Sequence, residues 1–332
     1  MMEWSGTVST RTATKKPTTV TVLVATYRRP GSLCRCLTAL SSQLLPPDEV
    51  LIVVRDEDAG SHAALQSPEV PRLPIRIVAV SAPGVVHARN AALAVCRSDV
   101  VAIIDDDTAP YPDWLQRVMQ AFQADPELGG LGGRDRCFGN GTFDDRQERR
   151  VGQITWYGKA FGNHHLGFGG MREVDLLKGA NMSFRMEAVG ATRFDTRLKG
   201  NGAQPAEDFC FSVAVKRSGW KLCYDPAAVL AHYAAERDEP RAYVGVQRVT
   251  DPQSFTDFCY NHVVALWGGL SPTRRAVFFV WSTLIGTDVF PGLVQAIRFT
   301  PSLGRSSWKR LYICQKTKCR AFWELATGGT TN

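Results

Sequence analysis

The order of apolar and polar positions predicts alternating strands and helices through the first 125 residues. Short β-branched and aliphatic runs predict strands, and apolar residues at helical spacing between them predict helices. The expected strands are residues 19–25, 49–54, 74–80 and 99–104, and the expected helices are residues 33–44, 86–95 and 111–123. This alternation predicts an α/β fold with a mostly parallel sheet and helices on both faces. Ligands of such sheets bind beyond the carboxyl ends of the strands.

The pattern changes after residue 125. Residues 129–170 are rich in Gly, Asn and aromatic residues and carry only short strand signals, which predicts a long loop region that is functional or mobile. A helix is expected at residues 207–218, and short strands are expected at 220–224 and 228–232. From about residue 236 onward the pattern is mainly helical.

Residues 274–298 form an apolar run with arginines at both ends. A helix of this length could cross a bilayer. However, Asp288 and Pro291 interrupt the run, and an Asp near the bilayer centre costs about 2.5–3.5 kcal/mol. Two interpretations stay open, namely a pair of helices packed on the preceding domain and a broken amphipathic element in contact with a membrane surface. A membrane span is the least favoured.

Composition and charge limit the class of protein. The chain has 332 residues, of which 44% are hydrophobic and 21% charged, as expected for a globular protein. Its net charge of +7 suits anionic partners such as nucleotide phosphates or anionic lipid. The nine cysteines form no Cys-x-x-Cys pair and are expected to be reduced thiols. With no secretory signal, we expect a cytoplasmic location, at the cytoplasmic face of a membrane if residues 274–298 contact one.

Three adjacent carboxylates, Asp105, Asp106 and Asp107, directly follow an apolar strand. Helix capping would require only one of them. At 4 Å, each pair of carboxylates repels by about 1 kcal/mol even in water, and a divalent cation relieves that repulsion. The cluster therefore predicts a site for Mn²⁺ or Mg²⁺ at the end of this strand.

Seven motifs surround this cluster in a defined order. They are VATYRRP, VVRDED, GVVHARNAAL, IIDDD, KGANMSF, AEDF and GWKLCYDPAAVLAH, and they lie within residues 20–233. Their order and spacing resemble those of family 2 glycosyltransferases, which have the GT-A fold. The resemblance implies a catalytic domain over residues 19–235, with a nucleotide-binding half (19–125) and an acceptor-binding half (126–235). Residues 1–18 are then expected to be a mobile tail, and residues 236–332 a C-terminal helical extension.

The resemblance also implies roles for single residues. The residues expected to bind the nucleotide sugar are Ala25, Thr26, Arg28, Asp56, Arg89, Asp105 and Asp106. Those expected to face the acceptor are Gly179, Ala180, Asn181 and Glu207. Asp107 and His232 are expected to hold the metal, and Asp208 is expected to act as general base. The implied reaction is an inverting, hexosyltransferase-type transfer from a nucleoside diphosphate sugar, by default a UDP-sugar, to a hydroxyl of a glycan or lipid-linked acceptor, as in polysaccharide biosynthesis.

Structural roles stay open for several of these residues. Arg29 is an alternative to Arg28 as a phosphate contact, and Asp56 fits an ordinary acidic loop, because Arg55 stands where relatives carry an acid. Asp208 fits the acidic N-terminus of a helix. Two other functions are also open: a metal-dependent nucleotidyl- or phosphotransferase, and a non-catalytic basic protein that binds membrane or nucleic acid. The sequence has no phosphate-binding loop of the Gly-x-x-x-x-Gly-Lys-Ser/Thr type, which weakens the nucleotidyl- or phosphotransferase alternative. It also has no recognisable nucleic-acid module, so we expect no nucleic-acid partner.

Overall fold

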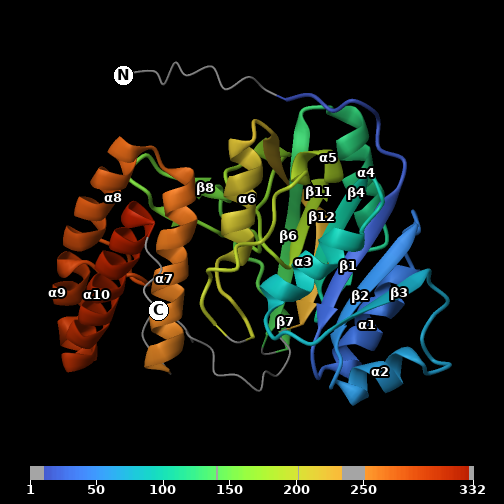
Figure 1. Ribbon diagram of the computed structural model, residues 1–332, viewed down its shortest axis with the longest axis horizontal. Helices are drawn as coiled ribbons and strands as arrows, with labels where there is room; N and C mark the ends of the chain where they lie inside the picture. The colour runs from blue at the N-terminus through green and yellow to red at the C-terminus, as the bar shows by residue number, and fades with distance from the viewer. Residues whose placement is uncertain (1–10, 140, 201, 234–250, 329–332) are drawn as a thin grey trace.

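The computed structural model describes residues 11–139, 141–200, 202–233 and 251–328. Ten of their strands form one sheet (Figure 1). Eight of them lie in the order β10-β12-β6-β11-β4-β1-β2-β3, while β5 pairs with β12 and β7 pairs with β6. The strands are β1 (Val20–Thr26), β2 (Glu49–Arg55), β3 (Ile75–Val80), β4 (Val100–Asp105), β5 (Thr108–Pro110), β6 (Leu128–Gly139), β7 (Thr142–Phe143), β10 (Arg172–Glu173), β11 (Asn181–Arg185) and β12 (Lys221–Tyr233). A separate pair consists of β8 (Gln153–Ile154) and β9 (Ala160–Phe161).

Parallel pairing dominates the half of the sheet that the sequence predicts best. β1 pairs in parallel with both β2 and β4, and β2 pairs in parallel with β3. The residues of β1, β2 and β4 are mostly apolar because helices cover both faces of these strands. The helices of this domain are α1 (Pro30–Ser41), α2 (Ala59–Leu65), α3 (Val85–Val95), α4 (Trp114–Ala124), α5 (Met186–Val189) and α6 (Glu207–Arg217). The predicted α/β architecture is confirmed, with element ends shifted by a few residues.

Two hydrophobic cores lie on opposite faces of the sheet. On one face, α1 and α4 pack with Leu37 and Trp114 against alternate residues of β1, β2 and β4. On the other face, α3 and α6 pack with Val86 and Phe211 against the remaining residues of the same strands. This packing holds α6, the helix that begins at Glu207, in a fixed position relative to the ends of the strands.

The prediction of a long loop at residues 129–170 is wrong for its first part, because that part belongs to β6, which pairs with β11 and β12. Five glycines in β6 hide its strand signal, since glycine is depleted in strands. Packing requires some of them: a Cβ at Gly130 would lie 2.7 Å from Leu222 and 2.9 Å from Phe184. The short strands expected at 220–224 and 228–232 are one strand, β12, with a register shift between Asp225 and Val229.

Replacing Gly133 with alanine should destabilise the protein. Its Cβ would lie 2.0 Å from the backbone oxygen of Ala228, so one strand must move. We expect Gly133→Ala to lower the free energy of unfolding by roughly 1–3 kcal/mol, measured by urea denaturation. Gly139→Ala in the same strand is the control, because no atom lies within 4 Å of its new Cβ. Equal stability of the two variants would contradict the prediction.

Residues 11–18, expected to belong to a mobile tail, are instead held against the domain. The backbone N–H of Arg11 donates to the oxygen of Gly219 at 3.0 Å, and that of Ala13 donates to the oxygen of Pro126 at 2.7 Å. Asp99 accepts the backbone N–H of Thr18 at 2.8 Å. The rest of the predicted tail, residues 1–10, lies outside the described residues, as do residues 236–250 of the expected extension.

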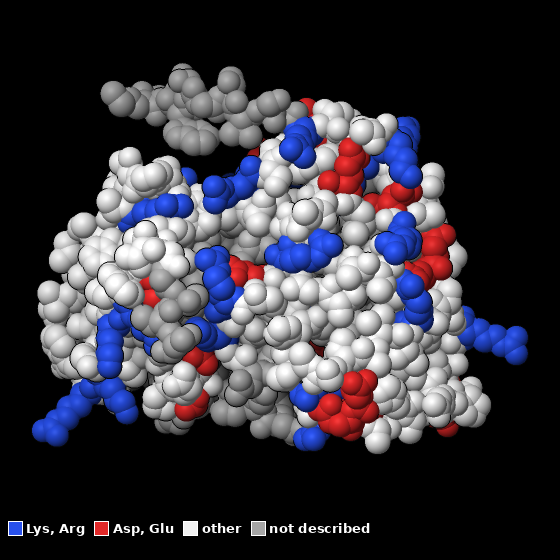
Figure 2. Space-filling model, viewed as in Figure 1, with Lys and Arg blue, Asp and Glu red and all other residues white. Residues whose placement is uncertain are grey.

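The C-terminal extension is helical, as predicted. It comprises α7 (Pro252–Gly269), α8 (Pro272–Leu284), α9 (Leu293–Leu303) and α10 (Arg305–Thr327). α7 packs between α6 and α10, and the helices form a layer at one end of the molecule (Figure 1). Figure 2 shows the outer edge of this layer as mostly uncharged, with a few Lys and Arg side chains projecting from its lower corner.

Residues 274–298 form two helices rather than one. The helix is interrupted at residues 285–292, where Gly286 and Pro291 form an isolated β-bridge. α8 packs on the α/β domain, because Phe278 joins a core cluster with Phe209 and Val213 of α6. Within the described part of the chain, no helix is both long and apolar enough to span a bilayer.

Candidate active site

The predicted site residues converge on one edge of the sheet. Ala25 at the end of β1 pairs with Asp105 at the end of β4. The turn at Gly179 precedes β11, which is the other neighbour of β4, and α6 begins at Glu207. This edge is the carboxyl end of the parallel strands, where ligands of α/β sheets bind.

Asp105, Asp107 and His232 form a candidate metal centre. One ligand atom from each of the three lies within 4.8 Å of the others. His232 Nε2 lies 3.3 Å from Asp107 Oδ1, because β12 carries His232 past the turn after β4. Two carboxylates and one imidazole can hold a divalent cation such as Mn²⁺ or Mg²⁺. The residues present therefore fit the metal that the resemblance implies.

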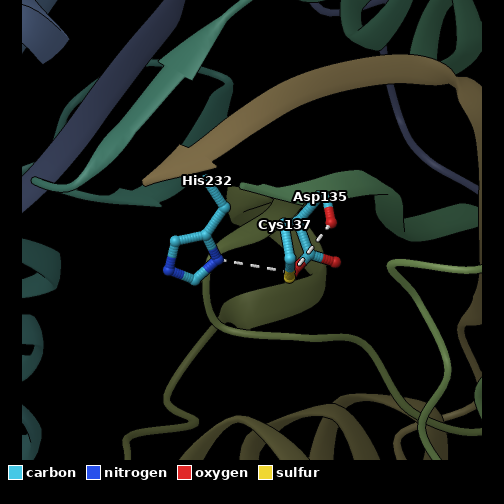
Figure 3. A group of neighbouring side chains, drawn as sticks. All are labelled: Asp135, Cys137 and His232. Atoms are coloured by element: carbon cyan, nitrogen blue, oxygen red, sulfur yellow. Dashed lines mark hydrogen bonds and ion pairs between the residues drawn. The ribbon is translucent and has the colours of Figure 1, made fainter. Parts of the chain in front are cut away.

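A second acid, Asp135, lies on the other side of His232. Figure 3 shows Asp135 and Cys137 from β6 and His232 from β12 pointing toward one another. His232 Nδ1 lies 3.4 Å from Asp135 Oδ2. Burial alone would lower the pKa of His232, but its hydrogen bonds with Asp107 and Asp135 outweigh burial and raise this pKa to about 11. The imidazole ring is thus held between two carboxylates.

Asp106 lies beneath the candidate metal centre. Its carboxylate is 0% exposed and accepts a 2.7 Å hydrogen bond from Thr26 Oγ1. Burial raises the pKa of Asp106 to about 7. Arg29 lies 3.1 Å from Asp106 and 3.4 Å from Asp107. Thr26 and Asp106 were both expected to contact the donor, but in this geometry both are buried, and Asp106 contacts Thr26 and Arg29.

Arg29, not Arg28, reaches the acidic cluster. The guanidinium of Arg28 lies 5.0 Å over the ring of Tyr27. Arg28 has a φ of 54°, in the left-handed region, and its backbone N–H donates to Asp58 Oδ2 at 2.6 Å. Asp58 is buried and also caps α2, so it joins the loops after β1 and β2. Asp56, the predicted base contact, is exposed at the end of β2.

Arg89 connects the two acidic groups of the site. This side chain on α3 is 2% exposed. Its guanidinium forms an ion pair with Asp105 at 3.0 Å and another with Glu207, and it donates to the oxygen of Gly179 at 3.3 Å. Arg89 therefore fixes the candidate metal centre relative to the start of α6.

Glu207 and Asp208 begin α6 next to the turn that precedes β11. Asp208 Oδ2 accepts the backbone N–H of Gly179 at 2.8 Å. Burial raises the pKa of both carboxyls, while Arg89 opposes that rise. A half-buried carboxylate with a raised pKa is suited to accepting a proton.

The Asn181 side chain, expected to face the acceptor, points into the protein instead. It accepts a hydrogen bond from Trp114 Nε1 at 2.9 Å and donates to the oxygen of Ala228 at 3.0 Å. It is 1% exposed, so an acceptor contact by this side chain is not formed in the described geometry. Ala180 beside it is also buried, and the contact with Arg89 and Asp208 comes from the Gly179 backbone.

Sequence reasoning missed two charged residues of the site. Asp135 is 0% exposed and forms an ion pair with Lys178. Burial alone would lower the pKa of Lys178, but the Asp135 carboxylate raises it. Lys178 is the first residue of the motif KGANMSF, which was a usable signal. Asp135 gave none, because it lies in the glycine-rich strand that was predicted to be a loop.

Solved structures with this architecture define the class of fold. TarS residues 1–349 of S. aureus, in complex with UDP-GlcNAc, aligns over 95% of this chain and 93% of its own, with a TM-score of 0.55 and 15% identity. The mannosyltransferase PcManGT of Pyrobaculum calidifontis, in complex with GDP-Man and Mn²⁺, aligns over 95% and 89%, with a TM-score of 0.51 and 16% identity. The fold is thus that of the GT-A glycosyltransferases.

The chain belongs to glycosyltransferase family 2. The sequence model described as "Glycosyl transferase family 2" matches residues 21–189. The succinoglycan biosynthesis protein ExoM of Rhizobium meliloti is 34% identical over 113 residues, which are 33% of this chain and 36% of ExoM. The chain spans between 36% and 47% of the length of the curated relatives it matches.

Proposed function

We propose that this protein is an inverting glycosyltransferase that moves a hexosyl group from a nucleoside diphosphate sugar to a hydroxyl. The observation that carries the proposal is the Arg89 bridge, which joins the Asp105–Asp107–His232 group to Glu207, the neighbour of Asp208 at the start of α6. The Asp105–Asp107–His232 group suits a metal-bound diphosphate, and the carboxylates at the start of α6 suit proton removal. An inverting transfer needs both functions on opposite sides of the sugar.

Asp105, Asp107 and His232 would hold the divalent metal, Mn²⁺ or Mg²⁺. A metal in this position supplies positive charge that stabilises the leaving diphosphate. Arg29 adds a positive charge 3.4 Å from Asp107 and keeps the cluster compact. Ala25 and Asp56 lie at the ends of β1 and β2, where the base and ribose of the donor would extend.

Asp208 would act as the general base. Its carboxylate takes the proton from the acceptor hydroxyl while that oxygen forms a bond to the anomeric carbon. The bond from this carbon to the diphosphate breaks in the same displacement, which inverts the anomeric configuration. The Gly179 backbone holds the Asp208 carboxylate in place, and Glu207 positions Arg89.

A glycan or lipid-linked hydroxyl is the proposed acceptor, and UDP the favoured nucleotide. The TarS complex contains UDP-GlcNAc, whereas the PcManGT complex contains GDP-Man, so the donor test must include both bases. The name of ExoM refers to succinoglycan biosynthesis, which supports a glycan acceptor and a place in polysaccharide biosynthesis.

The proposal is tested by incubating the protein with a panel of UDP- and GDP-sugars, with and without Mn²⁺. We expect Mn²⁺-dependent release of nucleoside diphosphate from one donor and inverted anomeric configuration in the product by NMR. Release of nucleoside monophosphate or pyrophosphate would instead indicate a phosphotransferase or nucleotidyltransferase. Absence of turnover with every donor would contradict the proposal.

A further inference from the structure

The positive charge of this protein is concentrated at its C-terminal end. Residues 271–332 contain nine Lys and Arg but only two acids, Asp288 and Glu324, which gives a net charge of +7. The whole chain also has a net charge of +7, so its first 270 residues are balanced. An excess of one sign in a single layer of helices indicates a surface for an anionic partner.

Exposed apolar side chains gather in the same part of the molecule. Among the described residues, thirteen large apolar side chains are exposed, and nine of them lie within residues 280–323. These nine are Val280, Leu284, Ile285, Leu293, Val294, Ile297, Trp308, Tyr312 and Trp323. Scattered single exposures are normal on a soluble protein, but such a concentration marks an interaction surface.

On α10, the aromatic and basic residues share one face, which we call the α10 outer face. At about 100° per residue, its members fall within about 120° of arc. They are Arg305, Trp308, Lys309, Tyr312, Lys316, Cys319, Arg320 and Trp323. The three aromatic side chains are between 44% and 64% exposed. No acid lies on this face: Glu324 is buried and forms an ion pair with Arg320 at 2.7 Å.

We propose that the α10 outer face binds the surface of an anionic phospholipid bilayer. Trp and Tyr prefer the interface between water and hydrocarbon, where the ring is buried and its polar group stays hydrated. Lys309 and Lys316 are exposed and would face lipid phosphates. This inference is independent of the proposed catalytic function, because it uses none of the active-site residues.

The neighbouring helix favours a bilayer over other anionic partners. α9 packs against α10 and exposes Leu293, Val294 and Ile297, which are 43%, 51% and 56% exposed. Aliphatic side chains gain free energy in the acyl region of a bilayer, whereas a nucleic acid offers them little apolar surface. A two-fold contact with a second copy would place Lys309 and Lys316 of both copies on one self-complementary patch, where like charges repel.

The experiment is vesicle flotation of the full chain. One set of vesicles is pure phosphatidylcholine, and the other contains about 30 mol% phosphatidylglycerol. We expect binding to the anionic vesicles at about 0.05 M salt and release at about 0.5 M salt. Lys309→Glu with Lys316→Glu should weaken partitioning by at least about tenfold. Trp308→Ser with Trp323→Ser should weaken it by a similar factor, and both double variants should keep the wild-type circular dichroism spectrum.

Matched controls come from exposed residues elsewhere in the protein. Arg72→Glu makes the same type of charge reversal at an exposed position before β3, and Trp156→Ser removes an indole that is 67% exposed. Both should bind vesicles like wild type. Several outcomes would overturn the proposal: no binding to anionic vesicles at low salt, equal weakening by the controls, or unchanged binding by both α10 variants. Binding of single-stranded RNA or a dimer that the α10 variants abolish, without vesicle binding, would assign the face to that partner instead.

Discussion

Asp208→Asn is expected to lower the turnover number by about 10²–10⁴-fold, the usual contribution of a general base. An amide cannot accept the acceptor's proton at neutral pH, while its size preserves the packing at the start of α6. Because Asp208 lies beside Gly179 and not within the Asp105–Asp107–His232 group, nucleotide affinity should change little. The measurement is initial rates of nucleoside diphosphate release, together with nucleotide binding by calorimetry.

The pH profile distinguishes a base from a structural carboxylate. Burial raises the pKa of Asp208, so the active carboxylate form is lost as pH falls through that raised pKa. The wild-type rate should therefore drop on the acid side at a higher pH than an ordinary Asp would give, and Asp208→Asn should lack this limb. Asp113→Asn, at a half-buried position paired with Arg117 and outside the site, is the matched control and should keep the wild-type rate. A fully active Asp208→Asn variant would rule out this base.

His232→Ala is expected to raise the Mn²⁺ concentration needed for half of the UDP-dependent thermal stabilisation by about 10–100-fold or more. Loss of an outer-shell partner costs a metal site this much, and a direct ligand should cost at least as much. The imidazole lies 3.3 Å from Asp107 and would complete the ligand set with Asp105. The readout is the UDP-dependent rise in melting temperature during a Mn²⁺ titration, which follows binding by mass action.

If His232 has only a structural role, its removal should change the melting temperature but not the Mn²⁺ requirement. His232 also lies 3.4 Å from Asp135, so its removal leaves two carboxylates without this partner and should lower the melting temperature in any case. Only a ligand role also shifts the Mn²⁺ requirement. His87→Ala, which removes an exposed histidine from α3, is the control for both readouts. A destabilised variant with an unchanged Mn²⁺ titration would show that His232 does not bind the metal.

Local sequence patterns were sufficient to predict the strands that are buried on both faces of the sheet. β1, β2 and β4 are buried on both faces, so their apolar runs are continuous and visible. β6 escaped prediction because its glycines are required by contacts with residues far along the chain, such as those of Gly130 with Phe184 and Leu222. The structural role of Asn181 escaped for the same reason, since its partners are Trp114 and the Ala228 backbone.

The sequence by itself determined the α/β class, the family resemblance and the placement of three adjacent acids after β4. It could do so because strand periodicity and motif order are written in neighbouring residues. Only the tertiary structure decided which acids share a site. Asp107 contacts His232, Asp105 contacts Arg89, and Asp106 turns inward toward Thr26. The three acids have different partners because adjacent residues at a strand end point in different directions, and long-range packing decides what each side chain meets.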